Sequence, residues 1–130
     1  FIWENPELSM QEHKSSKALI DLLTKNGFEV EVGVAGMPTA FIATYGSGKP
    51  VIGINAEYDA LPGLSQDPEK LEKCPVITGA PGQGCGHNLL GVGGAKAAIA
   101  IKNALEKFNL SGTVKVLGTP AEELCFVRIY

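Results

Sequence analysis

The 130-residue chain lacks several features that mark common functional classes. It has no cluster of lysine and arginine residues and a net charge of −3, so a nucleic acid is not an expected partner. Its apolar runs are all much shorter than the ~20 residues that cross a bilayer, so we expect no membrane partner. Its first residues lack the charged start and apolar centre of a secretory signal peptide. A globular domain, or part of one, is therefore the expected class.

Cysteine is scarce as well. The three cysteines stand at positions 74, 85 and 125, an odd number with no pairing pattern. Thiols that are free or bound to metal are typical of a reducing compartment, which predicts a cytoplasmic protein. No initiator methionine precedes Phe1, so we expect the chain to be a truncated part of a longer protein. With 45% hydrophobic residues it can still bury a core.

Two segments carry the periodicity of helices. Residues 9–26 place apolar side chains at helical spacing, and Ser9 with Glu12 has the pattern of a capping box at the start of this helix. Residues 88–108 contain no proline and are rich in small residues in their first half. Glycine costs roughly 1 kcal/mol per helix position relative to alanine, so its presence there predicts close packing against a sheet.

Four segments have the composition of strands, and a long loop interrupts them. The segment 51–56 is apolar almost throughout, which is typical of a central strand covered on both faces. The resulting order of helices and strands predicts an α/β fold, an αβα sandwich with a mixed sheet. The predicted strands are residues 28–34, 39–45, 51–56 and 113–118, and the loop is residues 60–81.

The glycine-rich stretch 82–88 places Cys85 and His87 two residues apart, directly before the second helix. Thiolate and imidazole are donors that zinc and related transition metals accept. Two other interpretations remain: buried structural residues, or a cysteine nucleophile with a histidine base. The nucleophile is disfavoured because an i, i+2 pair in a loop rarely directs both side chains at one proton. The glycines also fail to match the spacing of a nucleotide-binding loop.

Acidic residues follow two of the predicted strands. Glu57 and Asp59 leave the strand 51–56 on the same face, although a turn or a helix cap explains this pattern at least as well. Glu122 and Glu123 follow the strand 113–118, where the alternative is a solvated surface pair. A hydrolytic metal centre needs one carboxylate to ligate metal and another to accept a proton. Sites in open α/β sheets form beyond the carboxyl ends of the strands, so these stretches are predicted to meet there.

Four motifs in this order resemble the metal-dependent amidohydrolase and dipeptidase family. That family includes aminoacylases, auxin-conjugate amidohydrolases and carboxypeptidases, and the chain is most similar to its aminobenzoyl-glutamate utilisation protein B branch. The resemblance runs from about residue 2 to residue 123. The motifs are residues 5–12, 57–63, 84–91 and 118–123.

The resemblance implies a role for each of five residues. Cys85, His87 and Glu123 match metal ligands, and Glu122 matches the general base that activates the metal-bound water. Asp59 matches an acidic residue that orients a ligand. The implied cofactor is zinc or manganese, with two ions in many full-length relatives. The implied fold is a metallopeptidase-like catalytic domain.

The chain departs from the family pattern in three places, and the role of Glu57 stays open. Gln83 stands where many relatives have a histidine that we do not count as a ligand. Relatives continue after Glu123 with a glycine-rich turn and a helix, whereas residues 124–130 are mostly apolar. Two further histidine ligands and a lid-like dimerisation domain of the family are not encoded here. Besides His87 the sequence contains one histidine, His13, which lies in the first predicted helix.

Together these features predict that residues 1–130 form the N-terminal portion of one catalytic domain. The full-length enzyme is expected to hydrolyse an amide bond in a small N-acyl amino acid or dipeptide, as a homodimer. The chain alone is expected to be inactive, because catalytic zinc normally has three protein ligands and a water, and part of the family's set is missing. The alternative is a non-enzymatic remnant that acts through association, favoured by the apolar tail and an open sheet edge.

Overall fold

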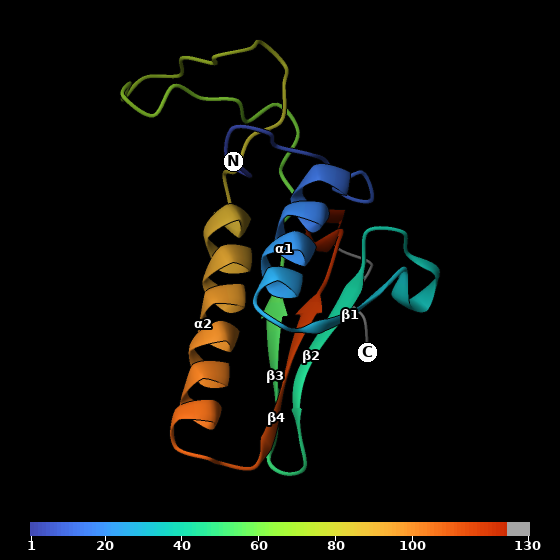
Figure 1. The fold of residues 1–130 in the computed structure, drawn as a ribbon. Helices are drawn as coiled ribbons and strands as arrows, with labels where there is room; N and C mark the ends of the chain where they lie inside the picture. Colours follow the sequence, from blue (N-terminus) through green and yellow to red (C-terminus); the bar gives the residue numbers. More distant parts are fainter. Residues whose placement is uncertain (125–130) are drawn as a thin grey trace.

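The computed structural model describes residues 1–124, in which a four-stranded mixed sheet carries two long helices on one face (Figure 1). The segment 125–130, which includes Cys125 and most of the apolar tail, lies outside the described residues. The helices are α1 (His13–Lys25) and α2 (His87–Lys107), and the strands are β1 (Glu29–Val32), β2 (Phe41–Ser47), β3 (Val51–Ala56) and β4 (Gly112–Gly118). Two short 3-10 helices complete the elements, η1 (Val34–Gly36) and η2 (Glu122–Leu124).

The order of the strands brings the acidic stretches to one edge of the sheet. The order is β1-β2-β4-β3, in which β4 is antiparallel to β2 and parallel to β3. Ala56, the last residue of β3, pairs with Gly118, the last residue of β4. Because parallel strands end at the same edge, residues 57–59 and 119–123 leave the sheet side by side, as predicted.

The core lies between the helices and the sheet. Alternate residues of each strand point toward the helices, and a stacked pair of rings, Phe41 and Tyr58 with centroids 6.1 Å apart, fills the end near the acidic stretches. Burial of these apolar side chains provides most of the stabilisation of such a domain. The largest fully buried apolar side chains are those of Leu19, Leu23, Phe41, Tyr58, Val114 and Val116.

The small residues of α2 allow it to approach the sheet closely. A Cβ atom at Gly91 would lie 2.5 Å from the Glu57 carbonyl oxygen, and one at Gly94 would lie 3.0 Å from the Asn55 carbonyl oxygen. The first contact is shorter than a side chain tolerates, so Gly91 is required, and the second would force its neighbour to shift by a few tenths of an ångström. The predicted close packing is confirmed, and it places the start of α2 beside the end of β3.

Most predicted elements are confirmed to within a few residues, but two interpretations are wrong. In residues 1–124, β3 lies at an edge of the sheet and is not central, and Val51 is 57% exposed. The capping box is absent as well: α1 begins at His13, and the carboxylate that accepts from the backbone N–H groups of its first turn, those of Lys14 and Ser15, is Glu7. Ser9 and Glu12 instead form hydrogen bonds with distant parts of the chain.

The segment between Leu61 and Gly82 contains no helix or strand, which agrees with the predicted loop. Its ends are joined by a pair of backbone hydrogen bonds between Leu61 and Gly82, of 3.0 and 3.1 Å. Within residues 1–124, no helix is both long enough and apolar enough to cross a membrane.

The buried Tyr58 generates a prediction about stability at high pH. Burial raises the pKa of Tyr58 well above its ordinary value, and Glu12 and Asp59 raise it further. The folded chain therefore keeps the phenol proton at a pH at which the unfolded chain has lost it. Above about pH 10 this group should lower the free energy of unfolding by about 1.4 kcal/mol per pH unit.

Urea unfolding of the parent chain and of Tyr58→Phe between pH 8 and pH 11 measures this effect. At pH 8 we expect the variant to be less stable by about 1 kcal/mol, because it loses the 2.6 Å hydrogen bond to the Thr39 carbonyl oxygen. At high pH the difference should shrink. An identical dependence on pH in both proteins would contradict the prediction.

Candidate metal centre

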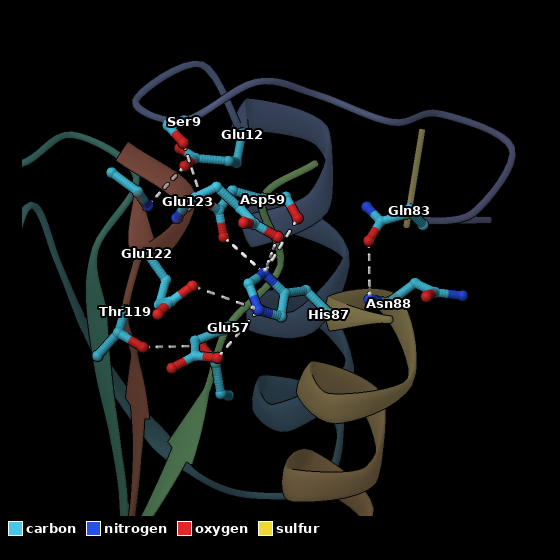
Figure 2. Close-up of polar contacts among 12 residues, drawn as sticks. Ser9, Glu12, Glu57, Asp59, Gln83, His87, Asn88, Thr119, Glu122 and Glu123 are labelled. Carbon is cyan, nitrogen blue, oxygen red and sulfur yellow. Dashed lines mark hydrogen bonds and ion pairs between the residues drawn. The ribbon is translucent and has the colours of Figure 1, made fainter. Parts of the chain in front are cut away.

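The imidazole of His87 lies at the centre of a cluster of carboxylates (Figure 2). His87 is the first residue of α2 and follows Gly86, whose φ of 82° turns the chain sharply into the helix. The side chain of His87 is only 5% exposed. Four carboxylates lie within 3.8 Å of its two ring nitrogens, and they belong to Glu57, Asp59, Glu122 and Glu123.

Asp59 fixes the orientation of this ring. One carboxylate oxygen of Asp59 lies 2.8 Å from Nδ1 of His87. The other oxygen accepts hydrogen bonds of 2.8 Å from the Ser9 hydroxyl and from the Glu123 backbone N–H. Because an ionised carboxylate only accepts hydrogen bonds, Nδ1 donates to Asp59, and in the neutral ring Nε2 keeps its lone pair.

The Nε2 side of the ring faces two further carboxylates. The nearest oxygen of Glu57 lies 3.2 Å from Nε2, and that of Glu122 lies 3.8 Å away. Two acceptors as close as Nε2 and Glu57 repel one another unless a proton or a cation lies between them. The arrangement therefore suits a cation at this side of the ring.

The donor atoms form two overlapping groups that share His87. Cys85, His87 and Glu123 offer ligand atoms within 4.8 Å of one another, and so do Glu57, His87 and Glu122. A thiol, an imidazole and carboxylates are the donor types of zinc and related divalent metals. The cluster brings four carboxylates around one imidazole, an excess of negative charge that a divalent cation would offset. The residues present fit a metal ion.

The carboxylates also affect Cys85, which is exposed at the rim of the cluster. Glu123 raises the pKa of the Cys85 thiol, and burial and the nearby charges of Glu122 and Glu57 raise it further. Negative charges disfavour the thiolate, whereas a cation at the same place has the opposite effect.

All five residues expected at the site lie in this cluster, and Glu57 joins them. The sequence also allowed Asp59 to be part of a turn or a helix cap. In the structure its carboxylate instead contacts Ser9, His87 and the backbone N–H of Glu123. Gln83 accepts a 3.1 Å hydrogen bond from the Asn88 backbone N–H in the first turn of α2.

Sequence reasoning missed the part that Ser9, Glu12 and Thr39 take in the surroundings of the cluster. Ser9 binds Asp59 directly, and Glu12 accepts hydrogen bonds from the Thr39 hydroxyl and the Ala121 N–H. Ser9 and Glu12 are visible in the sequence as a polar pair spaced like a capping box. Their partners Asp59, Thr39 and Ala121 are far away in the sequence, so spacing does not reveal them.

Comparison with known proteins gives relatives that cover nearly all of the chain. No family model matches it. The chain is 47% identical over 122 residues to a p-aminobenzoyl-glutamate hydrolase subunit of Escherichia coli (strain K12), an alignment that covers 94% of this chain and 25% of that protein. It is 38% identical over 128 residues to thermostable carboxypeptidase 2 of Saccharolobus solfataricus, covering 94% of this chain and 30% of that protein.

The fold has matching solved structures as well. The YXEP protein of Bacillus subtilis, described as a dinuclear metal binding peptidase from the M20 family, superposes with a TM-score of 0.72 at 30% identity. The match covers 93% of this chain and 33% of that one. The chain thus spans about a quarter to a third of the length of the relatives it matches.

Cobalt(II) provides a spectroscopic test of the group formed by Cys85, His87 and Glu123. Cobalt bound to a thiolate gives a charge-transfer absorption in the near ultraviolet, so we expect this band when the reduced chain is titrated with Co²⁺. Cys85→Ser should abolish it. Cys74→Ser is the matched control, because the backbone of Cys74 binds Gln66 in the loop away from the cluster. A band that survives in Cys85→Ser, or is lost in Cys74→Ser, would count against this group.

Asp59→Asn tests whether the orientation of His87 matters for the metal. The amide cannot accept from Nδ1, Ser9 and the Glu123 N–H as the carboxylate does, so we expect affinity for Co²⁺ to fall about 10- to 100-fold. Asp21→Asn, which alters an exposed carboxylate paired with Lys17, should leave the affinity unchanged. Equal affinities for both variants and the parent would refute the orienting role.

Proposed function

We propose that this chain, a relative of the metal-dependent amidohydrolase and dipeptidase family in sequence and fold, forms part of a hydrolytic metal centre. The substrate would be a small N-acyl amino acid or dipeptide, of the kind that the name of the Escherichia coli p-aminobenzoyl-glutamate hydrolase indicates for that protein. The observation that carries this proposal is the convergence of Cys85, His87, Glu122 and Glu123 at one edge of the sheet. The named relatives, hydrolases and peptidases, support it.

In this proposal Cys85, His87 and Glu123 hold a zinc or manganese ion. The Bacillus relative is described as dinuclear. Since one nitrogen of His87 can ligate only one ion, a further ion in the full-length enzyme would be held by the carboxylates of Glu57 and Glu122 and by additional ligands. When bound, such a cation polarises the scissile carbonyl and makes a water molecule easier to deprotonate.

Glu122 is the proposed general base. Its side chain is 41% exposed, so substrate and water can reach it, and its nearest carboxylate oxygen lies 3.8 Å from Nε2 of His87. It would accept the proton of the attacking water at this carboxylate and deliver it to the leaving nitrogen. The nearest carboxylate oxygen of Glu123 lies 3.8 Å from Nδ1 of His87, on the other side of the ring from Glu122, so the adjacent glutamates can divide the two roles.

The activity belongs to a larger unit in this proposal. Residues 1–130 would be the N-terminal portion of one catalytic domain, and further ligands would come from outside it. Support comes from the share of the relatives that the chain spans and from the three protein ligands in the first donor group. A homodimeric, cytoplasmic enzyme is the proposed context.

The test is hydrolysis of p-aminobenzoyl-glutamate by a longer protein that contains these residues, loaded with Zn²⁺ or Mn²⁺. Glu122→Gln should lower kcat about 10²- to 10⁴-fold, because the amide cannot accept the proton. The variant should still bind Co²⁺ with the thiolate absorption. Glu106→Gln, which alters an exposed partner of Tyr45, is the matched control and should keep full activity.

Two outcomes would contradict the proposal. Full activity in Glu122→Gln would remove this residue from the reaction. Failure of the metal-loaded protein to hydrolyse any of a panel of N-acyl amino acids and dipeptides would favour the alternative, a remnant that acts through association.

A further inference from the structure

Glu12 has a carboxylate that is completely buried next to the candidate metal centre. It accepts three hydrogen bonds from three separate parts of the chain. The Met10 N–H and the Ala121 N–H donate to Oε1 at 2.8 and 2.9 Å, and the Thr39 hydroxyl donates to Oε2 at 2.9 Å. Glu12 thereby joins the segment before α1, the segment before β2 and the turn after β4.

This environment is built for an ionised carboxylate. All three partners can donate, and an ionised carboxylate can only accept. A buried carboxylate without such partners would be strongly unfavourable, so the match of charge and donors explains how Glu12 is tolerated in the interior. The side chain does not cap α1, which would be the ordinary reason for an acidic residue at this position.

The partner that matters most is Ala121. Its φ of 64° lies in the left-handed region, which a residue with a Cβ atom rarely adopts. Ala121 is fully buried and directly precedes Glu122 and Glu123. The hydrogen bond from its N–H to Glu12 therefore holds a strained turn at the point where the chain delivers both glutamates to the cluster.

Ser9 acts on the same turn by a second route. Its hydroxyl donates to the oxygen of Asp59 that also accepts the Glu123 N–H (Figure 2). The segment 9–12 thus contacts the turn through Glu12 at Ala121, and through Ser9 and Asp59 at Glu123. Two separate hydrogen-bonded connections fix the backbone on either side of Glu122.

We propose that Glu12 is a positioning residue for the metal centre, which holds the 119–123 turn so that Glu123 meets Cys85 and His87. The inference rests on the proposed function, because it takes Glu123 as a metal ligand. Glu12 acts on the ligands indirectly, through its hydrogen bond with the backbone of Ala121. Its removal should alter metal affinity as well as stability.

The main test is Co²⁺ titration of the reduced chain and of Glu12→Gln, followed at the thiolate charge-transfer band. The glutamine oxygen can still accept from backbone N–H groups, but it carries no charge and the amide nitrogen replaces one acceptor oxygen, so the anchor of the turn is weakened. We expect affinity about 10- to 100-fold weaker, at a temperature at which circular dichroism shows both proteins folded. Parent-like affinity in folded Glu12→Gln would overturn the proposal.

A control separates positioning from general destabilisation. Leu23→Val alters a completely buried residue of α1 at the end of the helix away from the cluster, and it should lower the unfolding temperature. It should leave the affinity for Co²⁺ unchanged. If Leu23→Val weakens binding as much as Glu12→Gln does, Glu12 has only a structural role and the proposal fails.

Thr39→Val covers the case in which Glu12→Gln does not fold. The substitution keeps the shape of the side chain and removes only the hydroxyl that donates to Glu12. Binding of Co²⁺ should weaken several-fold. Unchanged binding in this variant would then overturn the proposal.

Hydrogen exchange distinguishes a failure of this inference from a failure of the proposed function. Without metal, the amides of Ala121 and Glu123 should exchange at least tenfold faster in Glu12→Gln or Thr39→Val than in the parent. The amides of Val114 and Val116 in β4 should not change. If the parent binds no Co²⁺ and this acceleration occurs, Glu12 positions the turn and the metal function fails. If the parent binds no Co²⁺ and exchange is unchanged, the proposal for Glu12 fails too.

Discussion

The carboxylate of Asp59 connects three separate segments of the chain at the candidate site. It accepts from Ser9 in the segment before α1, pairs with His87 at the start of α2, and accepts the N–H of Glu123 after β4. The three partners lie 50, 28 and 64 residues from Asp59 in the sequence. Because all three contacts are 2.8 Å long and Asp59 is 1% exposed, the ring and the turn have little freedom to move relative to one another.

The sheet makes this convergence possible, and the small residues of α2 complete it. The parallel pairing of β3 and β4 ends both strands together, so Glu57, Asp59 and the 119–123 turn emerge at one edge. Gly91 then allows the first turns of α2 to lie against the backbone of Glu57. The result is a high density of negative charge around one imidazole. Such a density is unfavourable without a cation, and a cation that binds only the folded chain would stabilise it.

The sequence predicted the elements and the place of the site, because both depend on local pattern and on a general rule of α/β sheets. The helix at 88–108 and the glycine-rich stretch before it were visible in composition, and the three stretches meet beyond the strand ends as expected. The capping box at Ser9 and Glu12 was a wrong interpretation. A local cap and a long-range contact use the same residue types, and spacing alone cannot separate them.

The position of β3 was wrong for a related reason. An apolar strand is typical of the middle of a sheet, but in residues 1–124 its only neighbour is β4. The neighbours of a strand in the sheet depend on other segments of the chain, and the residues of the strand itself do not specify them. The contribution of Glu12 likewise depends on Thr39 and Ala121, which lie 27 and 109 residues away.

The central claim is that Cys85, His87 and Glu123 ligate one metal ion, and X-ray absorption of the zinc-loaded chain tests it most directly. The predicted spectrum contains one sulfur at about 2.3 Å and nitrogen or oxygen ligands at about 2.0–2.2 Å. A zinc ion surrounded only by nitrogen and oxygen, with no sulfur at bonding distance, would contradict the claim.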